Sequence, residues 1–221
     1  MTAFTLDLAH MLAGGLVLAS FMLLYQARMP ALINVYALHA FILALSVAWQ
    51  AHVQAAPHLY VTAAIALVLK AMVIPLALQR VVVGLGIERT IETVGGIGLT
   101  MLAGMGLVAL SMVVMLRVTA SADPLAREDL AFALAVVLLG LLMMITRRIA
   151  VGQIVGFMSL ENGLILAAAG ARGMPLVVEI SVAFSVLIAL SVVIGIFLFR
   201  IREHFDTVDV GALEEVRGES R

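Results

Sequence analysis

The chain has 221 residues, of which 64% are hydrophobic and only 12% are charged, and its formal net charge is −1. Soluble domains carry about a quarter charged residues, so the composition excludes an ordinary water-soluble fold and offers no basic surface for nucleic acid. The chain has no cysteine, which excludes disulfides and thiolate ligands for zinc or iron–sulfur clusters. We therefore expect an all-α membrane protein with no cofactor of its own.

Seven apolar stretches are long enough to cross a bilayer, which takes about 20 helical residues. In chain order they are residues 8–25, 31–53, 58–78, 94–116, 129–146, 149–170 and 176–199. Residues 1–10 contain no Lys or Arg, so we expect the first stretch to be a retained span rather than a cleaved signal peptide. The sequence predicts a polytopic protein of about seven transmembrane helices, with residues 1–221 forming a single membrane domain.

The distribution of arginine between the loops predicts the orientation, because basic loop residues favour the cytoplasmic side. If the odd-numbered stretches run inward, the cytoplasmic side holds Arg28, Arg80, Arg89, Arg147, Arg148, Arg200 and Arg202. The outer side then holds Arg117, Arg127 and Arg172. We therefore expect the N-terminus outside and the tail, residues 200–221, in the cytoplasm.

Small residues recur at a spacing of four in two of the stretches. They are Gly96, Thr100 and Gly104 in the fourth stretch, and Gly152 and Gly156 in the sixth. This spacing is typical of seams where two membrane helices approach closely. Chance spacing is the alternative, because glycine is common in such helices.

Glu161 is the most informative polar residue of the apolar stretches. A charge at bilayer depth costs roughly 2.5–3.5 kcal/mol, so it calls for a partner or a function. Glu161 lies too far from either end of the sixth stretch for a short carboxylate side chain to reach water. A desolvated carboxyl group can bind and release protons near neutral pH, so we expect a proton relay. The alternative is a permanently protonated carboxyl that hydrogen-bonds a neighbouring helix.

Lys70 is the second candidate, eight residues before the end of the third stretch. It could act as a functional buried charge, and a buried lysine can also lose its proton. Two structural alternatives stay open. Its long stem could carry the ammonium toward the membrane surface, or the ammonium could bind the Ala71 carbonyl that Pro75 deprives of its usual amide partner.

His39 and Glu179 are weaker candidates for the same proton path. His39 lies within the second stretch and titrates near neutral pH when unperturbed, although a lone histidine there is more often a hydrogen-bonded packing residue. Glu179 follows Pro175 at the start of the last stretch. The helix dipole and interfacial water explain a carboxylate at that position adequately.

Several motifs resemble component E of hydrogenase-4-type complexes. They are RRI at 147–149, QIVGFMSLENG at 153–163, LKAMVIP at 69–75, PLVVEI at 175–180 and DTVDVGAL at 206–213. Residues 129–199 also resemble the three-helix K subunit of complex I and the C subunit of Mrp-type antiporters, where a glutamate at the place of Glu161 belongs to a buried proton path. The resemblance implies a K-subunit-like unit at 129–199, preceded by a four-helix extension at 1–116.

One departure from the K subunit matters for the proton path. K subunits carry a second acidic residue within the last helix, whereas Ser185 stands roughly at that place here. Either the path is rearranged, through Lys70 or a partner subunit, or this branch has lost pumping.

The resemblance implies a membrane subunit of a proton-translocating [NiFe]-hydrogenase or formate hydrogenlyase, in a bacterial or archaeal cytoplasmic membrane. The chain itself would not be an enzyme. Its partners would be antiporter-like and H-like membrane subunits and the peripheral nickel–iron and iron–sulfur subunits that hold the redox centres. The alternatives are a structural adaptor without pumping and a subunit of a cation/proton antiporter.

Overall fold

The computed structural model describes residues 3–84, 95–118 and 124–170, all of which belong to one compact unit, Met1–Ser185. The seventh apolar stretch, Glu179, Ser185 and the tail lie outside the described residues. In chain order the elements are α1 (Ala3–Tyr25), α2 (Met29–Gln54), α3 (Pro57–Ile65), the π-helix η1 (Ala66–Val73), α4 (Ile74–Gly84), α5 (Gly96–Val118), α6 (Pro124–Thr146) and α7 (Ala150–Gly170).

The described residues contain six helical segments that are long and apolar enough to cross a membrane, and no β-strand. The segments are Asp7–Tyr25, Met29–Gln54, Pro57–Arg80, Gly96–Met115, Glu128–Thr146 and Ala150–Gly170. Each differs by two residues or fewer at either end from the corresponding stretch expected from the sequence. The prediction of an all-α fold built from membrane-length helices is therefore confirmed for this part of the chain.

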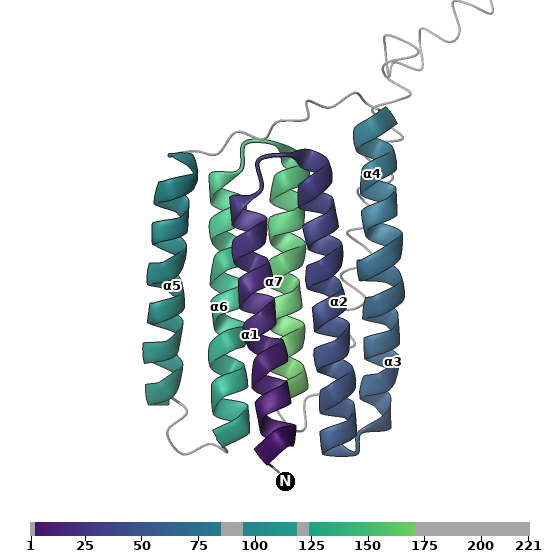
Figure 1. The fold of residues 1–221 in the computed structure, drawn as a ribbon, viewed down its shortest axis with the longest axis vertical. Helices are drawn as coiled ribbons and strands as arrows, with labels where there is room; N and C mark the ends of the chain where they lie inside the picture. The colour runs from purple at the N-terminus through teal and green to yellow at the C-terminus, as the bar shows by residue number, and fades with distance from the viewer. Residues whose placement is uncertain (1–2, 85–94, 119–123, 171–221) are drawn as a thin grey trace, which may run out of the picture. The chain divides into compact units, whose positions relative to one another are not determined.

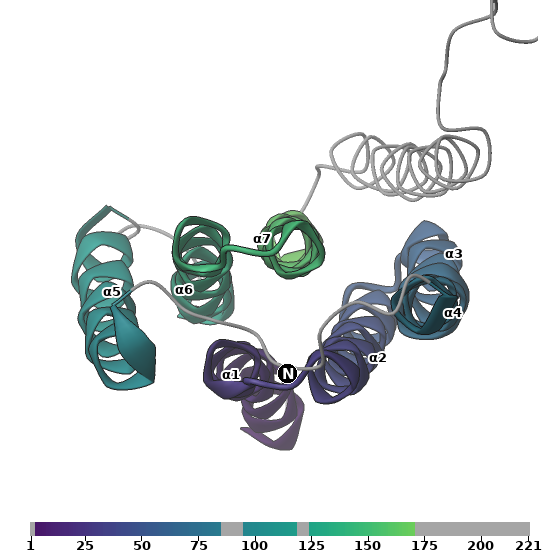
Figure 2. The ribbon, with the colours of Figure 1, turned by 90° about the horizontal axis from the view of Figure 1, so that it is seen from above.

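The helices of the expected N-terminal extension pack directly on those of the expected K-subunit-like unit. Helix α1 contacts α2, α5 and α6, and α2 contacts α7, η1, α3 and α4. Figure 2 shows α5, α6 and α7 in one row, with α1 and α2 facing them and α3 beside α2. The contacts of α1 with α6 and of α2 with α7 thus join helices from the two parts of the sequence.

The third membrane segment changes its helical winding around Lys70. Its middle part, η1, is π-helical, and the Ile74 N–H donates to the Leu69 carbonyl five residues earlier. Pro75 follows directly and has no amide hydrogen to donate. π-Helical turns are rare and are frequently found at functional sites. The wider winding sets the direction in which Lys70 leaves the segment.

Glycines allow α6 and α7 to approach each other closely. A Cβ atom added at Gly140 of α6 would lie 2.5 Å from the Leu160 backbone nitrogen of α7, and one at Gly163 would lie 2.9 Å from the Val137 backbone nitrogen. Gly156 faces α6 in the same way, 3.0 Å from the Met144 nitrogen. Backbone therefore packs on backbone along this seam, as small residues permit in membrane helices.

The seams expected from sequence spacing are only partly right. Gly156 lies in the α6–α7 contact and Gly104 meets side chains of α1 and α6. Gly152 instead lies against the side chain of Arg147, and a Cβ at Gly96 would meet nothing within 4 Å. The spacing rule fails at these two positions because it identifies small residues on one helix without identifying a helix that faces them.

We predict that Gly140→Ala lowers the thermal stability of the purified protein, because the new methyl group must push against α7 backbone that cannot rotate away. Overpacking of this kind costs about 1–3 kcal/mol. Gly106→Ala in α5 is the matched control, since a Cβ there meets nothing within 4 Å. Melting in detergent should fall for Gly140→Ala and stay level or rise for Gly106→Ala; equal melting would contradict the seam.

Arg147 ties the α6–α7 link to the end of α1. Its Nη2 donates to the carbonyls of Leu23 and Leu24, each at 2.9 Å, and only 2% of the residue is exposed. Figure 1 shows that the α1–α2 and α6–α7 links lie at the same end of the helices. Burial lowers the pKa of the Arg147 guanidinium from its ordinary value, yet arginine remains charged in proteins. The cation thus binds carbonyls that α1 itself leaves unpaired, at the negative end of its dipole.

We expect Arg147→Met to destabilise the protein by about 2 kcal/mol or more, because two charge-assisted hydrogen bonds to buried carbonyls disappear. Arg148→Met is the control, since Arg148 is exposed. Unfolding by denaturant in detergent should be shifted far more by the first change than by the second. A comparable effect of both changes would show that loop charge, and not the bridge to α1, stabilises this end.

Candidate functional site

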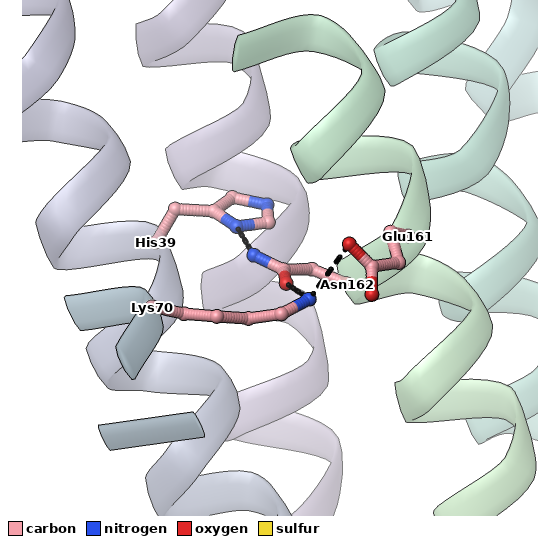
Figure 3. Close-up of polar contacts among 4 residues, drawn as sticks. All are labelled: His39, Lys70, Glu161 and Asn162. Carbon is pink, nitrogen blue, oxygen red and sulfur yellow. Dashed lines mark hydrogen bonds and ion pairs between the residues drawn. The ribbon is translucent and has the colours of Figure 1, made fainter. Parts of the chain in front are cut away.

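A buried ion pair lies between η1 and α7. Lys70 Nζ is 3.2 Å from Glu161 Oε2, and the side chains are only 2% and 5% exposed. Figure 3 shows the two side chains reaching toward each other from facing segments. The removal of both charges from water is costly, and it is tolerated only where the geometry is good and further hydrogen bonds satisfy the pair.

Asn162 supplies such a hydrogen bond and extends the site to α2. Lys70 Nζ donates to Asn162 Oδ1 at 2.8 Å, and the Asn162 amide nitrogen lies 3.0 Å from His39 Nδ1. The other ring nitrogen, Nε2, lies 3.0 Å from Ser20 Oγ of α1 and 3.4 Å from Ser159 Oγ of α7. A continuous polar chain therefore runs from Glu161 to α1 through the apolar interior.

The structure brings together three of the four residues expected in the proton path, namely Glu161, Lys70 and His39. Glu179 lies outside the described residues. The Lys70 ammonium is directed at α7 side chains rather than at the Ala71 carbonyl or at the end of its own helix. His39 is fully buried and hydrogen-bonded, which suits both a proton-carrying role and a packing role.

Sequence reasoning missed the uncharged members of the site. Asn162 and Ser159 are 0% and 1% exposed and Ser20 is 2% exposed. Tyr36, one helical turn before His39, is fully buried, and its hydroxyl has no hydrogen-bond partner among the described residues. Of these residues, only Asn162 could have been identified from the sequence. It directly follows Glu161, so two polar residues stand together in an apolar stretch.

A second buried polar cluster lies where α2 and α7 end and α6 begins. Gln50 donates to Asp129 Oδ2, and Gln54 donates both to Gln50 Oε1 at 3.0 Å and to the Ala169 carbonyl at 2.7 Å. Asp129 is only 1% exposed. In the sequence it is the first residue of the fifth apolar stretch, 129–146. These bonds join the ends of three helices, so the cluster has a structural role that requires no ligand.

The described residues contain no group of three or more His, Asp or Glu side chains that could hold a metal ion. The chemistry available at the Lys70 site is proton binding. Lys70 Nζ lies 3.2 Å from Glu161 Oε2, and the transfer of one proton from the ammonium to the carboxylate would convert a charged pair into a neutral one. Such a transfer leaves the net charge of the apolar interior unchanged, which keeps its cost low.

Comparison with known proteins gives one informative match. The uncharacterized protein Rv0085 of Mycobacterium tuberculosis is 33% identical over 220 residues, which cover 93% of this chain and 94% of the mycobacterial protein. The chain belongs to the family of this mycobacterial protein. No protein-family model and no solved structure matches the chain. The name of the relative states no activity, so it assigns none to this chain.

We predict that Lys70 and Glu161 are energetically coupled in a double-mutant cycle. Lys70→Met and Glu161→Gln should each lower stability in detergent, by roughly 3–5 kcal/mol where the remaining partner stays charged. The double replacement should cost clearly less than the sum, because it leaves no unpaired buried charge. Additive losses would show that the two groups do not stabilise each other.

Proposed function

We propose that this chain is a multi-pass membrane subunit that carries part of a proton path in a complex I-related [NiFe]-hydrogenase or formate hydrogenlyase. The single observation that carries the proposal is the buried Lys70–Glu161 pair, with its hydrogen-bonded extension to His39. In a purely structural interior, apolar side chains of similar size would serve as well or better. Costly ionisable groups inside membrane helices mark ion and proton paths by default.

The Lys70–Glu161 pair also offers a substitute for the second acidic residue that K subunits carry in their last helix and this chain lacks. A relay needs a second group that responds when Glu161 gains or loses a proton, and the resemblance leads one to expect a carboxylate near residue 185. Lys70 can fill this role from η1, because it already contacts Glu161 at 3.2 Å. A charge arriving in a neighbouring subunit would shift the balance between the charged and neutral forms of the pair, and so load or release a proton.

The remaining features of the proposal follow the sequence and the resemblance. The chain would have seven spans, with the seventh at residues 176–199, the N-terminus outside and the tail in the cytoplasm of a bacterial or archaeal cell. It would pack beside antiporter-like and H-like subunits and would anchor the peripheral nickel–iron and iron–sulfur subunits. Catalysis and redox centres would belong to those partners.

We expect Glu161→Gln to leave the complex assembled and to lower coupled proton movement at least about tenfold, because the amide keeps the size and hydrogen bonding but cannot bind a proton. The complex, isolated from native membranes by a tag on this chain, would be reconstituted in vesicles and assayed for hydrogen turnover and proton movement together. Glu128→Gln is the matched control, because the same change there affects a half-exposed carboxylate.

The same preparation separates the alternatives. Hydrogenase subunits that co-purify, together with full proton movement in Glu161→Gln, would replace the relay by a structural adaptor in which Lys70 and Glu161 merely tie η1 to α7. Antiporter subunits without hydrogenase subunits would assign the chain to a cation/proton antiporter.

A further inference from the structure

The hydrogen bonds around Asn162 have a direction, which Lys70 sets. A lysine ammonium can only donate, so the Asn162 atom that lies 2.8 Å from Lys70 Nζ must be the carbonyl oxygen Oδ1. The amide nitrogen Nδ2 is then the atom that faces His39 Nδ1 at 3.0 Å. Amide orientation is often ambiguous, but here a donor-only neighbour decides it.

The same direction continues through the histidine ring. Because Asn162 Nδ2 donates, His39 Nδ1 must accept, and a neutral ring then carries its hydrogen on Nε2. Nε2 lies 3.0 Å from Ser20 Oγ. Ser20 Oγ donates its own hydrogen to the Leu16 carbonyl at 2.9 Å, which leaves its oxygen able to accept. Each contact in this chain therefore pairs one donor with one acceptor when the ring carries its hydrogen on Nε2.

We infer that Lys70, acting through Asn162, holds His39 neutral with its hydrogen on Nε2, so that Lys70 and His39 do not carry positive charge at the same time. Asn162 is thus a positioning residue between the two. The inference deepens the proposed function and rests on it for its use in a proton path. No proton has to pass through the amide.

The opposite state requires a coordinated change. An imidazolium at His39 has a hydrogen on Nδ1 that needs an acceptor, and Asn162 can provide one by turning Oδ1 toward the ring. Its Nδ2 would then face Lys70, which can accept only as a neutral amine. Asn162 Oδ1 can therefore accept a hydrogen bond from a charged Lys70 or from a charged His39, but not from both at the same time.

The groups around His39 leave no other candidate for this control among the described residues. Ser20 comes from α1, Tyr36 from α2, Lys70 from η1, and Ser159, Glu161 and Asn162 from α7. At Nε2, Ser20 Oγ has its own hydrogen on the Leu16 carbonyl and accepts from the ring, which agrees with this tautomer, while Ser159 Oγ can accept or donate. Of these groups, the Asn162 amide is the one that hydrogen-bonds both Lys70 and the His39 ring, so it links the tautomer to the charge of Lys70.

The tautomer can be read directly from the ring nitrogens. The full chain, labelled with ¹⁵N-histidine and placed in lipid nanodiscs, would be examined by NMR, in which protonated and unprotonated ring nitrogens resonate far apart. The chain has five histidines, and loss of signals in His39→Gln assigns His39. We expect Nε2 protonated and Nδ1 unprotonated, and we expect His39 to stay neutral at a mildly acidic pH.

Two variants separate the role of Asn162 from simple charge repulsion. In Lys70→Met the amide is free to turn, so His39 should become at least about half protonated at the same mildly acidic pH. In Lys70→Met/Asn162→Leu the acceptor for Nδ1 is gone, so His39 should return to the neutral form. Repulsion alone predicts that the double variant stays protonated, and that result would overturn the inference.

Ser20→Ala is the control for the other side of the ring, and the hydrogen should stay on Nε2. A hydrogen on Nδ1 in the wild-type protein, or in Ser20→Ala, would overturn the inference even if the Lys70 variants fail to fold. These spectra need only this chain. Their outcome is therefore independent of proton movement in Glu161→Gln, and the tautomer and the relay can fail separately.

Discussion

The ion pair between Lys70 and Glu161 is the constraint on which the arrangement of this protein depends. Either group alone would be a costly charge in an apolar interior, so the chain must bring Lys70 Nζ of η1 to within 3.2 Å of Glu161 Oε2 of α7. Two features of the backbone serve that requirement. Lys70 lies in the π-helical winding before Pro75, and α2 packs against both η1 and α7.

The uncharged polar residues connect the ion pair to the rest of the interior through hydrogen bonds. Asn162 neighbours Glu161 in sequence but points its amide to Lys70 and His39, which come from two other segments. The chain of bonds ends at Ser20, whose hydroxyl bonds its own helix. Since each of these contacts pairs one donor with one acceptor, a change of protonation at Lys70 or His39 requires the Asn162 amide to reorient.

The sequence predicted the spans and the charged members of the site for a common reason. Lipid penalises every polar residue, so uninterrupted apolarity locates the helices and a lone Glu161 or Lys70 stands out. Ser20 and Asn162 could not be assigned in the same way, because hydroxyl and amide groups cost less and their partners depend on which helices touch. The glycine seams were only partly predicted for the same reason: Gly140, which the spacing did not identify, matters because α7 faces it.

The positions of Lys70 and His39 explain why the N-terminal helices belong to the site. Residues 129–199 hold Glu161 and Asn162, but the cation that neutralises Glu161 comes from η1 and the ring that Asn162 meets comes from α2. A three-helix unit alone has neither segment, so its buried glutamate would have to find a counter-charge in another subunit. In this chain η1 supplies it internally through Lys70. Residues of η1 and α2 therefore complete the electrostatic environment of Glu161, and a change in how α2 packs against η1 and α7 would alter the surroundings of the glutamate.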